Sequence, residues 1–361
     1  MNRGGIAIRL INLAKLATGR IPGALAHTNA VANMLFGAIS GSGTAAASAM
    51  GSIIGPIEAE EGYDAEFSAA ANIATAPTGL LIPPSNVMIT FSLVSGGTSV
   101  AALFMAGYIP GILWGLACMI VIYIFAKKKG YKSTSSFKGK EKLMVIWQAL
   151  PSLLMIVIVI GGIIGGIFTA TEGSVVAVVY TLILSLFFYK TIKFKDLPEI
   201  FLASAEMTGI IVFLIGVSSI MSWVMAFTDI PTLVSNALLG ISNNKYVIFF
   251  IINIILLIVG TFMDMTPATL IFTPIFLPIC QRLGMNVIHF GIMMIFNLCI
   301  GTITPPVGTT LFVGVKVGGT TIEKVIKPLL WYFAAIFAVL MLVTYVPQIS
   351  LWLPGVMGYV K

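Results

Sequence analysis

Two stretches decide the fold of this chain, because each interrupts an apolar segment with two adjacent prolines. They read Thr75-Ala76-Pro77-Thr78-Gly79-Leu80-Leu81-Ile82-Pro83-Pro84-Ser85-Asn86 and Gly301-Thr302-Ile303-Thr304-Pro305-Pro306-Val307-Gly308-Thr309-Thr310. A Pro-Pro pair removes two backbone donors, and its rings clash with the preceding helical turn. One such site alone favours a kinked helix with Ser and Thr capping the kink. Because the pair occurs twice, within an internal repeat, two broken helices are favoured instead.

The sequence around these stretches has the composition of a membrane protein. Of its 361 residues, 58% are hydrophobic and 9% are charged, and the mean hydropathy is +1.04. Soluble domains carry about 25% charged residues, so a soluble enzyme is excluded. No alternating ten-residue pattern suggests a barrel. The three cysteines are far apart and predict neither a metal site nor a disulfide framework. The sequence therefore predicts an all-α polytopic membrane protein.

Crossing the hydrocarbon of a bilayer takes about 20 apolar residues in a helix. Five segments qualify without interruption: 101–126, 146–168, 175–189, 208–227 and 329–346. Segments 29–57 and 246–279 are as apolar but carry polar, helix-breaking tips at residues 40–44 and 260–267. Each has about the length of two half-crossings, so we predict two re-entrant hairpins whose tips are buried in protein or line a wet cavity. Segments 65–94 and 287–317 contain the Pro-Pro pairs.

An internal repeat joins these features. Shifting the sequence by 222 residues aligns residues 42–101 with 264–323 without a gap, and 13 of the 60 positions are identical. The identities include both Pro-Pro pairs, Gly79 with Gly301, and Gly96-Gly97-Thr98 with Gly318-Gly319-Thr320. The helix-breaking Pro and Gly residues occur in the same order in both stretches. We therefore expect two homologous halves, each with a hairpin and a broken helix.

The basic residues give the orientation of the two halves. Seventeen of the 20 Lys and Arg lie in four clusters: residues 3–20, 127–142, 190–195 and 316–327. Basic short loops stay in the cytoplasm. The first hairpin then enters from the cytoplasm and the second from outside, which makes the repeats inverted in the membrane. Inverted repeats with discontinuous helices are typical of secondary transporters, which bind substrate and ions at mid-membrane. The net charge of +7 comes with no nucleic-acid motif.

This topology divides the chain into successive parts. We expect an amphipathic cytoplasmic arm, a first transport half, scaffold helices with a basic cytoplasmic loop at 127–142, an outer amphipathic connector, a second transport half, and a cytoplasmic connector with a C-terminal scaffold helix. Their ranges are 1–27, 28–100, 101–228, 229–245, 246–318 and 319–361.

The tips and broken segments supply oxygen ligands for a hard cation such as Na⁺. The first predicted ion site comprises Ser40, Gly41, Ser42, Thr44, Thr78 and Gly79; the second comprises Thr261, Asp264, Thr266, Gly301, Thr302 and Thr304. Asp264 is the one acidic residue that we place in the middle of a hydrophobic segment, where ionisable groups are costly and by default functional. Its alternative role is to cap the half-helix that begins at Met265. The predicted substrate-binding residues are Ser85, Asn86, Thr309 and Thr310.

Enzymatic chemistry has no support in the sequence. No serine is paired with a histidine, and we expect His27 and His289 to be interfacial. Walker and dinucleotide-binding motifs are absent, which excludes ATP hydrolysis by this chain. Energy must come from an ion gradient or a partner. Because no chain of intramembrane carboxylates is visible, we expect Na⁺ rather than a proton relay.

Several motifs resemble the large membrane subunit of TRAP (tripartite ATP-independent periplasmic) transporters. They are residues 1–10 (MNRGGIAIRL), 36–43 (FGAISGSG), 60–64 (EEGYD), 82–85 (IPPS) and 304–308 (TPPVG). The resemblance spans the whole chain, except that family members carry further hydrophobic helices ahead of the first motif. It implies a Na⁺-driven elevator mechanism in the bacterial inner membrane, a small four-helix membrane subunit, and a periplasmic binding protein that delivers an organic anion. Family substrates are mostly carboxylates, such as C4-dicarboxylates, sialic acid and other sugar acids.

Three alternatives stay open from the residues. The chain could be an anion transporter of a related inverted-repeat family that works without a binding protein. It could be a transport-dead membrane scaffold, which the missing N-terminal helices favour. An intramembrane enzyme ranks third, because no nucleophile and base occur together.

Overall fold

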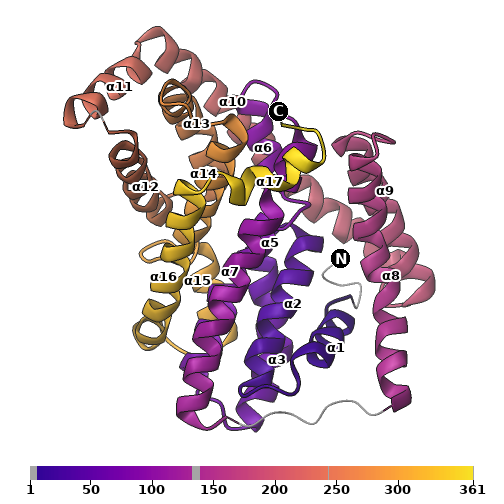
Figure 1. The fold of residues 1–361 in the computed structure, drawn as a ribbon. Coiled ribbons are helices and arrows are strands. Elements are labelled where there is room, and N and C mark those ends of the chain that lie inside the picture. The colour runs from indigo at the N-terminus through magenta and orange to yellow at the C-terminus, as the bar shows by residue number, and fades with distance from the viewer. Residues whose placement is uncertain (1–5, 132–138, 243, 361) are drawn as a thin grey trace. The chain divides into compact units, whose positions relative to one another are not determined.

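The computed structural model describes residues 6–131, 139–242 and 244–360, and regular structure within them is entirely helical (Figure 1). This confirms the prediction of an all-α chain. Parts of three predicted segments lie outside the described residues: the first five residues of the arm 1–27, residues 132–138 of the basic loop 127–142, and Asn243 of the connector 229–245. Lys361 also lies outside them.

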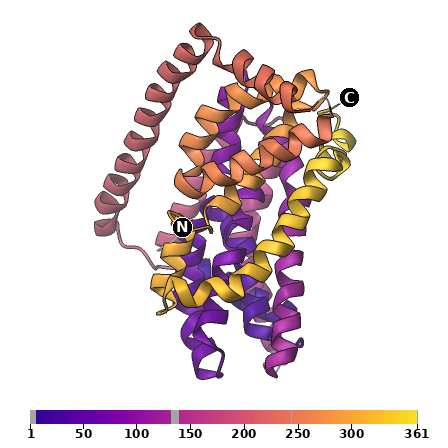
Figure 2. The same ribbon diagram turned by 90° about the vertical axis from the view of Figure 1, so that its left-hand side faces the viewer.

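Within the described residues, six helices are long and apolar enough to cross a membrane. They are Val100–Lys129, Glu141–Ile164, Thr171–Phe188, Phe194–Val217, Lys245–Phe262 and Ile322–Tyr345. A bent pair, Ala65–Leu81 with Asn86–Val94, meets the same criteria as a seventh span with an angle of 47°. The polytopic membrane protein is thus confirmed. The span predicted at 208–227 is longer than expected, because the helix begins at Leu197, and Figure 2 shows it as one long rod.

The chain divides into two compact units. Unit 1 comprises Met1–Ser85, Gly111–Phe194 and Thr309–Val339. In Figure 1, α1 lies beside α2, and α8 beside α9, as their contacts require. The helices of unit 1 are α1 (Ile6–Thr18), α2 (Ala24–Ser40), α3 (Gly43–Glu60), α4 (Ala65–Thr75), α5 (Thr78–Leu81), most of α7 (Val100–Lys129), α8 (Gly139–Ile164), α9 (Ala170–Ile183) with the π-helical turn η1 (Leu184–Phe188), α15 (Thr309–Val317) and most of α16 (Ile322–Tyr345).

Unit 2 comprises Asn86–Pro110, Lys195–Gly308 and Leu340–Lys361. In this unit α12 packs on α14, and α13 packs on α6, α10, α11 and α14. Its complete helices are α6 (Asn86–Val94), α10 (Leu197–Phe227), α11 (Ile230–Ile241), α12 (Lys245–Phe262), α13 (Met265–Arg282), α14 (Val287–Gly301) and α17 (Gln348–Val356); the 3-10 turn η2 (Phe194–Asp196) lies at its boundary.

Two of the five boundaries between the units fall at the proline breaks. At the first break the chain leaves unit 1 after Ser85, and at the second break it returns to unit 1 at Thr309. Each unit therefore contains one hairpin, the first half of one broken helix and the second half of the other. α15 packs on α3 and α4 in unit 1, and α6 packs on α13 and α14 in unit 2. The two halves of the repeat thus exchange their second half-helices.

Both predicted hairpins are present as helix pairs with tight turns. The α2 helix ends at Ser40 because Gly41 adopts a left-handed conformation (φ 61°), and its N–H donates to the Gly37 carbonyl. Ser42 then caps α3 by accepting a hydrogen bond from the Ala45 N–H at 3.3 Å. In the second hairpin, Met263 and Asp264 are extended and separate α12 from α13. The depth of both turns in the membrane stays a prediction.

Both Pro-Pro pairs interrupt their helices as predicted. Ile82 is extended after α5, and the next helix begins only at Asn86. The second interruption separates α14, which ends at Gly301, from α15, which begins at Thr309. Both Pro-Pro peptide bonds are cis.

Candidate ion and substrate sites

Unit 1 contains all six residues of the first predicted ion site, on the tip at residues 40–44 and on the broken segment at residues 75–86. These two parts of the chain approach very closely through glycines. A Cβ atom placed on Gly79 would lie 2.1 Å from the Cα atom of Gly37. Since no side chain fits there, glycine at both positions allows the α2 backbone to reach the broken helix just below the tip.

The tip itself is rich in hydroxyl oxygens. The Ser42 and Thr44 hydroxyls are 3.1 Å apart, and the Ser40 hydroxyl donates to the Ser42 carbonyl at 3.4 Å. On the broken segment, the Thr78 hydroxyl donates to the Thr75 carbonyl at 2.6 Å. A hydroxyl that donates one bond retains lone pairs that accept another bond or ligate a cation.

Unit 2 contains all six residues of the second predicted site and repeats this arrangement. A Cβ atom on Gly301 would lie 2.4 Å from the carbonyl carbon of Gly260, at the end of α12. The Val307 N–H in the broken segment also donates to the Thr261 carbonyl at 3.1 Å. Tip and broken segment are therefore joined directly in both units.

The polar side chains of the second site differ in how they are held. The hydroxyls of Thr261, Thr302 and Thr304 each donate to a carbonyl three or four residues earlier, in α12 or α14, at 2.7, 2.8 and 2.7 Å. Asp264 occupies the N-cap position of α13, but its exposed side chain forms no capping hydrogen bond. The capping hydrogen bond considered for Asp264 is thus not formed here.

The four predicted substrate residues separate into buried and accessible members. Ser85 and Thr310 are each 1% exposed, and neither hydroxyl has a hydrogen-bond partner among the described residues. Thr309 is half-buried and Asn86 is exposed. Thr310 also lies near the first tip, since its hydroxyl would be 3.3 Å from a Cβ atom on Gly43. Ser85 and Thr310 both belong to unit 1, whereas Asn86 belongs to unit 2.

Buried asparagines form networks that the sequence analysis did not identify. In unit 1 the Asn33 amide donates to the side-chain oxygens of Asn72 at 3.0 Å and Thr75 at 2.9 Å, which ties α2 to α4. In unit 2 the Asn253 amide donates to the Thr344 hydroxyl at 3.0 Å, and the Asn297 amide donates to Asn253 at 2.8 Å. Asparagine inside an apolar run was the available signal, because polar groups in membrane helices usually have partners.

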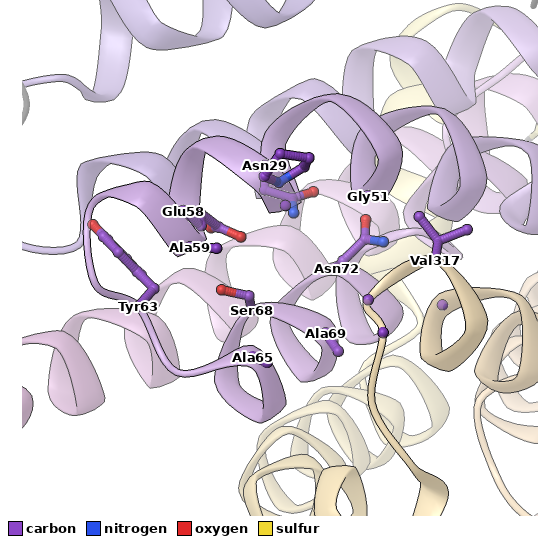
Figure 3. Close-up of a pocket in the computed structure, with 15 residues that line it drawn as sticks. Asn29, Gly51, Glu58, Ala59, Tyr63, Ala65, Ser68, Ala69, Asn72 and Val317 are labelled. Carbon is purple, nitrogen blue, oxygen red and sulfur yellow. The ribbon is translucent and has the colours of Figure 1, made fainter.

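Glu58, on α3, is a second residue that the sequence analysis missed. Its side chain is fully buried, and neither carboxyl oxygen has a hydrogen-bond partner among the described residues. It lines a partly open cavity of about 230 Å³, to which α2, α4 and α15 also contribute (Figure 3). Asp264 is therefore not the only acidic side chain within an apolar part of the chain.

The histidines and cysteines do not form a reactive cluster in the described part of the chain. His27 and His289 are buried within the protein, each 2% exposed, and their position at the membrane interface stays a prediction. The Nε2 atom of His289 lies 2.7 Å from the Val343 carbonyl oxygen. All three cysteines are buried, and among the described residues no three His, Cys, Asp or Glu side chains gather as a metal site would require.

Comparison with known proteins identifies the family. Residues 1–349 match the family model of the tripartite ATP-independent periplasmic transporter DctM component. The chain is 55% identical to YgiK of Salmonella typhimurium, over 98% of this chain and 81% of that protein. It is 39% identical to the isethionate TRAP transporter permease protein DctMQ of Oleidesulfovibrio alaskensis, over 98% of this chain and 56% of that protein.

A third relative is the C4-dicarboxylate TRAP transporter large permease protein DctM of Pseudomonas aeruginosa. It is 38% identical over 99% of this chain and 84% of its own length. These matches and the apolar helices establish a multi-pass protein of the bacterial inner membrane that is a transporter component and not an enzyme. This chain belongs to the DctM family, the large permease components of TRAP transporters.

Proposed function

We propose that this chain moves a small organic anion across the inner membrane together with Na⁺. The carrying observation is the duplicated contact between a hairpin tip and a broken helix, at Gly37 and Gly79 in unit 1 and at Gly260 and Gly301 in unit 2. Each contact brings hydroxyl and carbonyl oxygens beside interrupted backbone, which is the chemistry that a hard monovalent cation requires.

The substrate class follows from two kinds of support. The Ser85 and Thr310 hydroxyls are buried without partners among the described residues, and buried polar groups ordinarily have partners, so a ligand that accepts hydrogen bonds suits each of them. The named relatives transport isethionate, a sulfonate, and C4-dicarboxylates. An organic anion with carboxylate or sulfonate oxygens fits both observations, and sugar acids fall in the same chemical class.

We further propose that the chain works with two partners, a small four-helix membrane subunit and a periplasmic binding protein that delivers the anion. Transport would proceed by an elevator motion, in which the two hairpins and broken helices move against the remaining helices. The exchange of half-helices between the two units supports this proposal, because it links the two hairpins through both broken helices.

The test is uptake of a labelled organic anion into proteoliposomes that contain the complete membrane complex. Uptake should require both the added binding protein and an inward Na⁺ gradient, and a proton gradient alone should not drive it. Equal uptake under either gradient would contradict Na⁺ coupling. Full uptake without the binding protein would instead indicate an anion transporter of a related inverted-repeat family, which works without a binding protein.

A further inference from the structure

The cavity that contains Glu58 has no part in the proposed Na⁺ sites, although all its lining residues belong to unit 1. Glu58 is 0% exposed, so its carboxyl group does not reach the molecular surface in this arrangement. Among the described residues, no Lys, Arg or His lines the cavity. A carboxyl group is therefore enclosed without a cation.

Two polar side chains beside Glu58 each have an atom without a hydrogen-bond partner among the described residues. Figure 3 shows the Ser68 side chain, from α4, next to the Glu58 side chain, with the Asn29 side chain from α2 above them. The Ser68 oxygen and the Asn29 side-chain nitrogen have no hydrogen-bond partner among the described residues. Ser68 is 9% exposed and Asn29 is 1% exposed, so neither gains a partner from bulk water.

Among the described residues that line the cavity, no group neutralises Glu58. Glu61, at the end of α3, is acidic, and Tyr63 and the buried Tyr332 of α16 are neutral phenols. Lys316 of α15 is exposed and lines an adjoining hollow, which shares Gly51, Pro56 and Val317 with this cavity; Lys316 itself does not line the cavity of Glu58.

An ionised carboxylate that is buried without a partner is strongly disfavoured. The neutral acid suits the same surroundings, because its O–H can donate to Ser68 and its carbonyl oxygen can accept from the Asn29 amide.

We propose that Glu58, with Ser68 and Asn29, forms a proton-binding site of this chain. When the cavity admits water, a hydronium ion transfers its proton to one Glu58 oxygen and leaves as a neutral water molecule. The carboxylate becomes a carboxylic acid, and small rotations of the three side chains complete its two hydrogen bonds. The chain then carries an enclosed proton at a place separate from the two hairpin tips.

A metal cation fits this cavity less well than a proton. The Asn29 atom without a partner is an amide nitrogen, which donates hydrogen bonds and does not ligate Na⁺. The Asn72 side-chain oxygen already accepts a hydrogen bond from Asn33 at 3.0 Å. Among the described residues that line the cavity, Ser68 and Tyr63 have the neutral side-chain oxygens without a hydrogen-bond partner, whereas hard cations require a shell of several oxygens.

The experiment is infrared difference spectroscopy on the purified full-length chain in lipid, recorded as the pH is raised at constant Na⁺. The wild-type chain should lose the C=O stretching band of a protonated carboxyl group, and Glu58→Gln should lack this band. Glu60→Gln, at an exposed neighbouring position of α3, is the control and should retain it. Ser68→Ala, which removes one hydrogen-bond partner of the acid, should move the transition to a different pH.

Three results would overturn the proposal. The band could be the same in Glu58→Gln and wild type, or it could be unaffected by Ser68→Ala. It could also respond to Na⁺ at constant pH, which would make the cavity a metal-cation site. Elution as a single species in gel filtration confirms that each variant is folded. Because this readout needs no transport, its failure is distinct from a failure of Na⁺-coupled uptake.

Discussion

Gly79→Ala should weaken the contact between the first tip and its broken helix. The new Cβ atom would lie 2.1 Å from the Gly37 Cα atom, whereas ordinary contacts begin at 3.4 Å, so the two segments must separate by about 1.3 Å, the difference between these distances. The obstructing atoms are backbone, and no side-chain rotation relieves them. Overpacking of this kind costs about 1–3 kcal/mol.

This cost applies only while tip and broken helix touch, which is the arrangement that we propose for bound Na⁺. At 1.4 kcal/mol for each tenfold change, Gly79→Ala should raise the Na⁺ concentration for half-maximal uptake roughly five- to hundredfold. The assay is labelled-anion uptake in proteoliposomes at a series of Na⁺ concentrations. Gly55→Ala is the matched control, because it lies in α3 and its Cβ atom would meet nothing within 4 Å.

An unchanged Na⁺ requirement in Gly79→Ala would refute the reasoning, provided that the variant inserts and elutes like the wild type. An equal loss in Gly55→Ala would also refute it, since alanine in a helix interior should stabilise the chain by about 0.5–1 kcal/mol relative to glycine.

Three further predictions follow from the structure. Asp264→Asn should fold normally, because no capping hydrogen bond is lost. It should need about tenfold more Na⁺ for half-maximal uptake, because it removes a Coulomb contact worth roughly 4 kcal/mol, and even a third of that energy corresponds to a tenfold change. An unchanged Na⁺ requirement in the uptake assay would remove Asp264 from the site. A cysteine at Lys128 should react with an impermeant thiol reagent only after the inner membrane is opened, and one at Ser242 should react in intact spheroplasts. The three native cysteines are buried and should not react. The reverse labelling pattern would overturn the topology. The hydrogen bond from Lys129 lowers the pKa of Asp64, so this ion pair should stabilise the chain above the usual aspartate pKa and lose its effect as the pH falls through the lowered value. At neutral pH the thermal unfolding of wild type and Asp64→Asn should differ slightly, because the pair is exposed. An equal difference in strong acid would contradict this assignment.

The broken helices and hairpins were predictable from the sequence because their causes are local. Proline pairs cannot continue a helix, and a glycine such as Gly41 ends one through its left-handed conformation, so residue types alone mark these positions. The internal repeat adds the second observation that a single kink lacks. The length of α10 was underestimated, because its first turns carry Glu199 and other polar residues and fall outside an apolar window.

The exchange of half-helices between the two units was not predictable. It depends on where α6 and α15 pack, and their sequences are apolar without a pattern that names a partner helix. Glu58 was missed for a related reason. It stands close to Glu60 and Glu61, so the segment reads as a charged helix end, and only the packing of α2, α4 and α15 shows that one of these carboxyl groups is enclosed.

For the candidate sites, too, the residue types were predictable from the sequence, but the contacts between distant residues were not. Their residue types follow from the need for oxygen ligands, and both sets of six fall within one unit each. The approaches of Gly37 to Gly79 and of Gly260 to Gly301 join positions that are distant in sequence, so the repeat predicts their equivalence but not their contact.

Equilibrium binding of radioactive sodium to the purified chain tests most directly whether each unit holds an ion. Wild type and Gly55→Ala should bind the same amount, and Gly79→Ala and Gly301→Ala should each lose one site, leaving the site of the other unit intact. If neither variant changes the amount of bound sodium or its affinity, or if the wild-type chain binds none, the two tip contacts are not sodium sites.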